Sequence, residues 1–184
     1  SSSNTSLARN FPMTNSCVIN EKERTFYTMT VDQDFVQTMG LKIIEGRDFS
    51  MNISTDQYGA MIINETAVKE FELTEPIGTE LEMFGYKVFI IGVMKDFHAS
   101  SFHKKIPPSA LWVAPWGGTI NFRIDGKNID KSIEYIKKTW DEFSPDVPFE
   151  YHFLEDEYDS LYKSEERFNL LVAYFSILAI FIAC

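Results

Sequence analysis

Residues 86–94, YKVFIIGVM, are the strongest strand signal in the chain. The run is nearly continuous in apolar residues and rich in β-branched and aromatic types, a pattern typical of a strand buried within a sheet. The preceding segment, EPIGTELEM, indicates a turn that leads into another strand, and Gly85 suits a hairpin turn between the two. The fold is therefore expected to form around a sheet with residues 86–94 inside it.

Further elements are expected on both sides of this strand. The predicted strands are TFYTMTV (25–31), LKII (41–44), AMIIN (60–64), ALWVAP (110–115), TINFRID (119–125) and PFEYHF (148–153). Short helices are predicted after Asp32 or Asp34, ending at Gly40, and after Asn64. The clearest amphipathic helix follows Asn128 as its cap and stops before Pro145. Residues 1–25 are expected to be irregular or part of an incomplete first element.

This order of elements predicts an α+β fold, built from strand–helix–strand units around an antiparallel-looking middle. The length of 184 residues fits one domain or two small lobes. Composition shifts near residues 47–59 and 96–108 suggest hinges between two lobes. We therefore expect a core domain over residues 1–154, with a second lobe at roughly 46–108 nested in the first.

Residues 168–184 contain no charged side chain. Their apolar residues occur on every side of a helix, whereas a helix docked on a soluble core keeps a polar stripe. We expect residues 155–184 to form a stalk helix that runs into the start of a truncated transmembrane helix, with 168–184 in the lipid bilayer. A buried C-terminal core helix is the alternative. Only Lys163 and Arg167 are positive just before this run, which favours the outer face of the membrane for the preceding domain.

The formal net charge of −10 argues against nucleic acid as a partner, because phosphate binding needs clustered lysine and arginine. It argues equally against attachment to anionic lipid headgroups. The two cysteines, Cys17 and Cys184, are too few for a disulfide framework, and no bridge between them is expected.

No catalytic residue is expected, and no cofactor. The only Gly-Lys pair, Gly126-Lys127, precedes Asn128 and lacks the earlier glycine of a phosphate-binding loop. The metalloprotease H-E-x-x-H, the redox C-x-x-C and the hydrolase G-x-S-x-G motifs do not occur in the sequence. The protein is accordingly predicted not to be an enzyme, and its binding residues stay unassigned.

Two groups of side chains are weighed as metal ligands and set aside. His98 and His103, with Asp96 nearby, are the strongest such group, but their spacing matches no common ligand pattern and further ligands are lacking. The second group consists of four carboxylates, namely Glu155, Asp156, Glu157 and Asp159. These lie on a predicted helix without the glycine turn of a calcium loop, so a solvated face is expected.

Several segments in the same order resemble one protein family. VDQDFVQTMGLKIIEGRDFS resembles a helix and strand ending in a Gly-Arg-x-Phe turn, and MIINETAVKEF with PIGTEL is similar to a strand, helix and Pro-x-Gly turn. VFIIGVMKDFHASSFHKKIPP resembles a glycine-bearing strand followed by a Lys-Asp-Phe-His loop. The segment from Glu155 to Cys184 looks like the start of the second membrane helix. Over residues 20–184 the chain thus resembles the MacB-like periplasmic core domain of FtsX-like ABC transporter permeases, most closely the Bacteroidetes type.

The resemblance implies a two-lobed domain in the periplasm, carried by the bacterial inner membrane. It implies a non-catalytic role in which ATP hydrolysis by a separate ATP-binding cassette ATPase is coupled mechanically to export or release of a substrate. A second permease half or homodimer partner and a periplasmic adaptor are the further partners that it implies. The family includes export, lipoprotein release and regulation of cell-wall hydrolases.

Two other functions fit the residues less well. The first is a ligand-sensing extracytoplasmic domain of a membrane receptor such as a sensor kinase, which would share the acidic domain and the span. The second is a soluble enzyme with a buried terminal helix.

Overall fold

The computed structural model describes most of the chain up to residue 157. The described residues are 1–3, 6, 13–19, 22–83, 85–97, 105–114, 118–157, 172 and 174–175.

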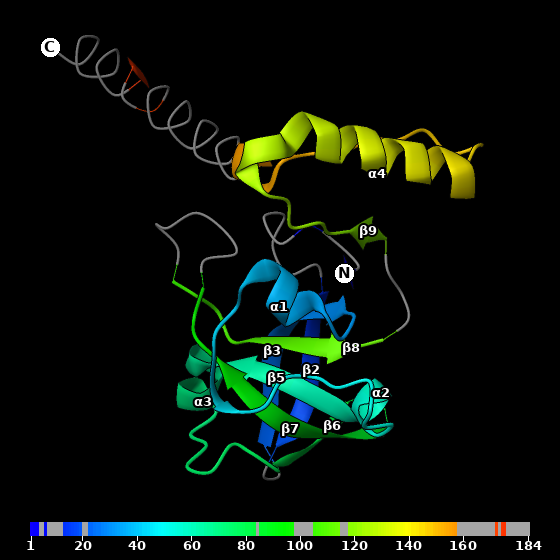
Figure 1. Cartoon of the computed structure of the whole chain (residues 1–184). Helices are drawn as coiled ribbons and strands as arrows, with labels where there is room; N and C mark the ends of the chain where they lie inside the picture. Colours follow the sequence, from blue (N-terminus) through cyan, green and yellow to red (C-terminus); the bar gives the residue numbers. More distant parts are fainter. Residues whose placement is uncertain are drawn as a thin grey trace, which may run out of the picture.

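Six strands pair in a ring (Figure 1). They are β2 (Met13–Ile19), β3 (Lys22–Val31), β5 (Ala60–Asn64), β6 (Glu80–Met83), β7 (Tyr86–Met94) and β8 (Ser109–Val113). The order is β2-β6-β7-β5-β8-β3, and β2 also pairs with β3, so the pairings return to their start. β3–β8 and β5–β7 are parallel, and the other pairs of the ring are antiparallel. The sheet is therefore mixed and closes on itself, which leaves few exposed edges.

Three shorter strands extend this ring. β1 (Ser2–Ser3) pairs with β3 and with β9 (Thr119–Ile120), and β4 (Ile43–Gly46) pairs with the second half of β7. β7 is thus flanked on one side by β6 along its first half and by β4 along its second.

The ring of strands separates two hydrophobic clusters. Alternate residues of β5 show the division, because Met61 and Ile63 belong to the first cluster whereas Ile62 belongs to the second. Every residue of β5 and β8 is buried, as a strand covered on both faces requires. The first cluster draws on all six strands, with members such as Phe26 and Ile90.

Two short helices complete these clusters. α1 (Phe35–Met39) places Phe35 and Val36 in the second cluster and ends at Gly40, whose φ of 69° is the left-handed conformation of a helix C-terminus. α3 (Glu65–Glu70) places Ala67 in the first cluster. Phe71, directly after α3, contacts the Phe26 ring edge-on at 6.1 Å between centroids.

The long helix α4 (Ile129–Phe143) follows a 3-10 turn, η2 (Gly126–Asn128), and lies apart from the ring of strands (Figure 1). None of its residues is buried, despite its clear apolar stripe. Its described apolar partner is the segment 148–153, where Phe149 contacts Trp140 at 6.1 Å between ring centroids. The side chain that caps this region is Asp125, which accepts a hydrogen bond from the Lys127 N–H, and not Asn128.

Three predictions from the sequence were wrong in detail. Residues 13–19 are not irregular but form β2, which pairs along its whole length with β3. The strand predicted over 119–125 covers only Thr119–Ile120, and 148–153 is assigned to no strand. The last two cases share a cause, because a strand is defined by its partner and alternation alone does not supply one. The sheet is also more mixed than the antiparallel-looking middle suggested.

The chain's apolar end lies largely outside the described residues. Of residues 168–184, the structure describes 172, 174 and 175, which are helical and exposed. No helix within the described part of the chain is long and apolar enough to cross a membrane. The truncated transmembrane helix therefore stays a prediction, as does the division into two lobes.

Candidate functional site

Two clusters of polar side chains stand out among the described residues, and the first surrounds the start of α3. Asn64 at the end of β5 is 1% exposed, and its Oδ1 accepts hydrogen bonds from the N–H groups of Ala67 and Ser109, each at 2.9 Å. Its Nδ2 donates to the Pro107 carbonyl at 3.0 Å. The predicted cap of this helix is confirmed, and the same side chain also fixes the start of β8.

Asp96, just after β7, joins the same cluster. Its Oδ1 accepts from the Thr66 N–H at 3.0 Å and its Oδ2 from the Thr66 hydroxyl at 2.8 Å. The Asp96 N–H in turn donates to Glu65 Oε2 at 2.9 Å. A carboxylate at a helix N-terminus is favoured both by the free N–H groups and by the helix dipole. We call Asn64, Glu65, Thr66 and Asp96 the α3 junction.

The α3 junction holds the two chain segments that flank residues 98–104. On one side of that stretch Asp96 is held by Thr66, and on the other side Pro107 and Ser109 are held by Asn64. Glu70, at the end of α3, accepts a hydrogen bond at the surface from Lys105, with 2.8 Å between Lys105 Nζ and Glu70 Oε1. This hydrogen bond raises the pKa of Lys105. His98 and His103 lie outside the described residues, so the structure does not test whether they bind a metal ion. Asp96 is bound to Thr66 in the structure.

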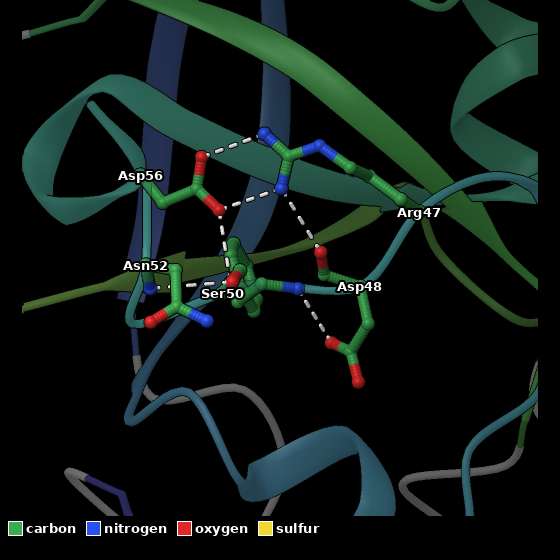
Figure 2. A network of polar contacts seen from close by, with 6 residues as sticks. Arg47, Asp48, Ser50, Asn52 and Asp56 are labelled. Carbon is green, nitrogen blue, oxygen red and sulfur yellow. Dashed lines mark hydrogen bonds and ion pairs between the residues drawn. The ribbon is translucent and has the colours of Figure 1, made fainter. Parts of the chain in front are cut away.

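The second cluster is the turn that joins β4 to the short helix α2 (Asp56–Gly59). Figure 2 shows the Arg47 guanidinium facing the Asp56 carboxylate, with Nη1–Oδ2 and Nη2–Oδ1 distances of 2.6 and 2.8 Å. Asp56 is 2% exposed and also accepts the Ser50 N–H at 2.9 Å. Arg47 additionally donates to the Asp48 carbonyl at 3.1 Å. We call residues 47–56 the arginine turn.

The electrostatics of the arginine turn follow from these contacts. The hydrogen bonds from Arg47 hold the pKa of Asp56 below its ordinary value of 3.8, against the opposing effect of burial. The same bonds raise the pKa of Arg47 further. Burial raises the pKa of Asp48, and the hydrogen bond from the Phe49 N–H partly offsets it. Arg47 and Asp56 thus form a bidentate ion pair in which each charge compensates the other.

Two glycines allow the arginine turn to lie directly on β7. Gly46 has a φ of 73°, and a Cβ there would come within 2.3 Å of the Ile91 carbonyl oxygen. A Cβ on Gly92 would come within 2.4 Å of the Arg47 carbonyl oxygen. The Arg47 N–H accordingly donates to the Ile91 carbonyl at 3.0 Å. Only glycine permits this approach of the two backbones.

The central side chains of both clusters are engaged in hydrogen bonds. The carboxylates of Asp56 and Asp96 are bound to neighbouring residues, and the side chain of Asn64 is bound on both its oxygen and its nitrogen. Within the described ranges no group of three or more histidine, cysteine, aspartate or glutamate side chains could hold a metal ion. Those ranges include Glu155, Asp156 and Glu157 but not Asp159. The chemistry of both clusters is therefore that of fixing backbone segments in place.

Cys17 is the described cysteine, and it is free and buried in the first hydrophobic cluster. Burial raises the pKa of its thiol to about 12, so the nucleophilic thiolate is scarcely populated at neutral pH. Cys184 lies outside the described residues.

The sequence indicated part of these clusters. Asn64 was identified as a cap, and the segments 47–59 and 96–108 were singled out as hinges. The pairing of Arg47 with Asp56 and of Thr66 with Asp96 was missed, because both bring together residues whose proximity depends on the sheet. The Gly-Arg dipeptide after a strand and the Asp after β7 were the available signals.

A family model described as the MacB-like periplasmic core domain matches residues 6–136. Both polar clusters fall within this range. No curated protein matches the chain.

The solved structures that resemble the chain include the following three. The extracellular domain of the noncanonic ABC-type transporter YknZ from Gram-positive bacteria has 19% identity and a TM-score of 0.44, with 55% of this chain and 50% of that chain covered. The periplasmic region of MacB from Actinobacillus actinomycetemcomitans has 15% identity and a TM-score of 0.45, with 69% and 63% covered. A domain of a putative permease protein from Porphyromonas gingivalis has 15% identity and a TM-score of 0.47, with 74% and 72% covered. The chain thus spans half the length of the first of these domains and somewhat less than two thirds of the second.

Proposed function

The chain belongs to the family of MacB-like periplasmic core domains, and on this basis we propose that it is the extracytoplasmic domain of an ABC transporter permease subunit. The single observation that carries the proposal is the family match over residues 6–136, which includes all six strands of the ring. In this role the domain faces the periplasm and the protein resides in the bacterial inner membrane.

The domain acts mechanically and has no catalysis of its own. Hydrolysis of ATP by a separate ATPase subunit moves the membrane helices, and the domain converts that movement into export or release of a substrate. Such a role needs a rigid body with a defined point at which displacement enters. The closed ring of strands, with its two polar clusters holding the connecting segments, supplies the rigid body.

Among the described residues, Leu154 is the one best placed to pass a movement of the C-terminal helix to the core. It lies at the start of the helical residues 154–157 and packs against the second hydrophobic cluster, which contains Phe35 of α1 and Leu111 of β8. Glu157, one turn later, accepts a hydrogen bond from the Ser6 hydroxyl. Movement of the chain beyond residue 157 would therefore be felt first in α1 and the face of the sheet beneath it.

The remaining parts of the proposal follow the family. Residues 1–154 are the core domain, with a second lobe at roughly 46–108, and 155–184 are the stalk that continues into the bilayer through 168–184. A second permease half or homodimer partner and a periplasmic adaptor complete the assembly.

The location is tested by cysteine labelling in intact cells. Met51→Cys, at a position that is 77% exposed, is introduced with Cys17→Ser and Cys184→Ser so that it is the one thiol within residues 1–184, and the same protein without Met51→Cys is the control. A membrane-impermeant maleimide is expected to label it once the outer membrane is permeabilised. Labelling only after the inner membrane is broken would place the domain in the cytoplasm and exclude the proposal.

The mechanical role is tested in the complete membrane assembly with its ATPase. Locking the ATPase with a non-hydrolysable ATP analogue should change hydrogen–deuterium exchange at the amides of α1, and Leu154→Ala should reduce that change. Val147→Ala is the matched control, since Val147 is exposed and is not part of the second cluster. Exchange in α1 that ignores the nucleotide would contradict mechanical coupling through this contact.

A further inference from the structure

Residues 148–153, which we call the aromatic segment, run beside α4 as an uncoiled stretch of chain (Figure 1). Phe149 and Tyr151 stack with ring centroids 5.7 Å apart, and Tyr151 and Phe153 meet edge-on at the same distance. Contact between residues two apart in sequence is the signature of extended chain, in which alternate side chains share a face. The aromatic segment therefore has the geometry of a strand.

Nevertheless, no strand that the structure describes pairs with its backbone. Among the residues that the structure describes, no backbone hydrogen bond joins residues 148–152 to another segment. The nearest backbone bonds are local ones, from the Val147 N–H to Ser144 and from Glu157 to the Phe153 carbonyl. An extended segment whose N–H and C=O groups are free offers the pairing edge that a further strand requires.

The rings of the aromatic segment are only partly covered. Tyr151 is 51% exposed and Phe153 is 38% exposed, although Trp140 of α4 packs against the neighbouring ring of Phe149. Partly exposed aromatic side chains are the type enriched at the centre of protein interfaces. An incoming strand would thus gain apolar contacts as well as backbone hydrogen bonds.

The aromatic segment and the chain around it are predominantly acidic. The neighbouring helix α4 carries Lys131, Lys137 and Lys138, but it also carries four acidic residues, so it does not offset the charge of the segment. No lysine or arginine occurs between Lys138 and Lys163. The acidic residues of this interval that the structure describes are Asp141, Glu142, Asp146, Glu150, Glu155, Asp156 and Glu157. Pairing of two copies through this segment would bring like charges together, and an anionic lipid surface would be repelled in the same way. A positively charged partner is favoured by the same argument.

We propose that the aromatic segment is a docking edge for an extended, basic polypeptide segment, which adds to it as a β-strand. Alternate apolar side chains of that partner lie on Tyr151 and Phe153, and its lysines or arginines lie near Glu150 and the acidic residues that follow. The proposal rests on this local geometry and charge, and it holds independently of the transport role.

The test measures amide hydrogen–deuterium exchange of the whole 184-residue chain in a neutral detergent. The probe is a heptapeptide of alternating lysine and valine. One control peptide has glutamate in place of lysine, and another is the basic peptide with every backbone amide N-methylated, so that neither of its edges can pair as a strand. In the free chain, the amides of residues 149–152 are expected to exchange rapidly. The basic peptide should slow them about tenfold or more, and neither control peptide should do so.

Two variants connect the effect to the site. Glu150→Lys should weaken binding of a labelled basic peptide about tenfold by fluorescence anisotropy, which corresponds to about 1.4 kcal/mol. Glu23→Lys makes the same charge change at an exposed position on β3 and should leave the affinity within about twofold. Equal weakening by both variants, or equal binding of the N-methylated peptide, would reduce the interaction to general charge attraction and overturn the proposal. Slow exchange at residues 149–152 without peptide would overturn the proposal as well. If the rate does not depend on protein concentration, the edge is already paired within the chain. If protection rises with protein concentration, the edge is paired with a second copy.

Discussion

The guanidinium of Arg47 binds both carboxylate oxygens of Asp56 across nine positions of sequence, and it does so where Asp56 is almost completely buried. The pair fixes the turn that returns the chain from β4 to β5. Arg47 itself stays partly exposed, with 42% of its side chain accessible, so water screens one side of the interaction.

Replacing Asp56 by asparagine is expected to lower the free energy of unfolding by about 1–3 kcal/mol, because it removes the charge-assisted bonds to Arg47 and leaves a buried amide in their place. Urea denaturation followed by circular dichroism measures the change. Glu80→Gln is the control, since it breaks the exposed ion pair with Lys87 and should cause no measurable loss. Equal stability of the Asp56 variant and the parent would show that the bidentate pair contributes nothing net.

The same pair predicts a pH dependence. Because Arg47 holds the folded pKa of Asp56 below 3.8, its stabilising contribution is complete above that pH and is lost as the pH falls through the lower folded value. The stability difference between the parent and Asp56→Asn should therefore be constant from pH 7 to about pH 5 and shrink below about pH 4. Comparing the two proteins at each pH cancels the titration of the other carboxylates. A difference that grows on acidification would contradict the assigned direction.

Gly92→Ala is expected to destabilise the fold by about 1–3 kcal/mol, since the added Cβ would meet the Arg47 carbonyl oxygen and force β4 away from β7. Thermal unfolding measures it. Gly59→Ala introduces the same methyl group where no atom lies within 4 Å, and should change the stability by no more than about 0.5 kcal/mol. Similar losses in both variants would point to the unfolded chain and not to this close approach.

Asn64→Ala should cost about 1–3 kcal/mol, because it leaves the N–H groups of Ala67 and Ser109 without their buried acceptor. The effect should also be local, with faster hydrogen–deuterium exchange at the start of α3 and of β8 than elsewhere. Asn52→Ala is the matched control, since Asn52 is exposed and its side chain makes no hydrogen bond with the described residues. Uniform acceleration of exchange would mean that the α3 junction has no separate role.

Cys17 is expected to react with a thiol reagent only when the chain opens, because its thiol is buried and has a pKa of about 12. In a Cys184→Ser background at pH 8, labelling should be on the order of a thousandfold slower than in urea. The exposed Met51→Cys thiol, with Cys17 also replaced by serine, should react nearly as fast folded as unfolded. Rapid labelling of native Cys17 would show that the first hydrophobic cluster opens easily.

The sequence predicted those elements whose own residues determine them. The apolar run of β7, the short apolar strand β5 and the stripe and Pro145 stop of α4 were all confirmed, because apolar runs and periodicity are local properties of the chain. The strand β2 was missed, since only Cys17 and Ile19 of it are buried and the apolar Met13 and Val18 lie on its exposed side, which blurs the alternation. Its existence depends on pairing with β3.

The polar clusters were predictable only in part, for a related reason. Asn64 caps the helix that follows it directly, so the sequence placed it correctly. Asp96 and Thr66 are thirty residues apart, and they meet because β5 and β7 run parallel and end together. The aromatic alternation of 148–153 was visible as well, but the sequence could not show that the segment would pair with none of the described strands.

The ring of strands also dictates the order in which the molecule can be completed. β8 lies between β3 and β5, yet it follows both along the chain, and β2 waits for β6 more than sixty residues later. A chain delivered from its N-terminus therefore carries an open seam between β3 and β5 until Val113 has emerged. Over that interval the apolar sides of β3 and β5 are unprotected. Slow synthesis of residues 65–113 would therefore prolong the exposure of these surfaces to chaperones and to aggregation.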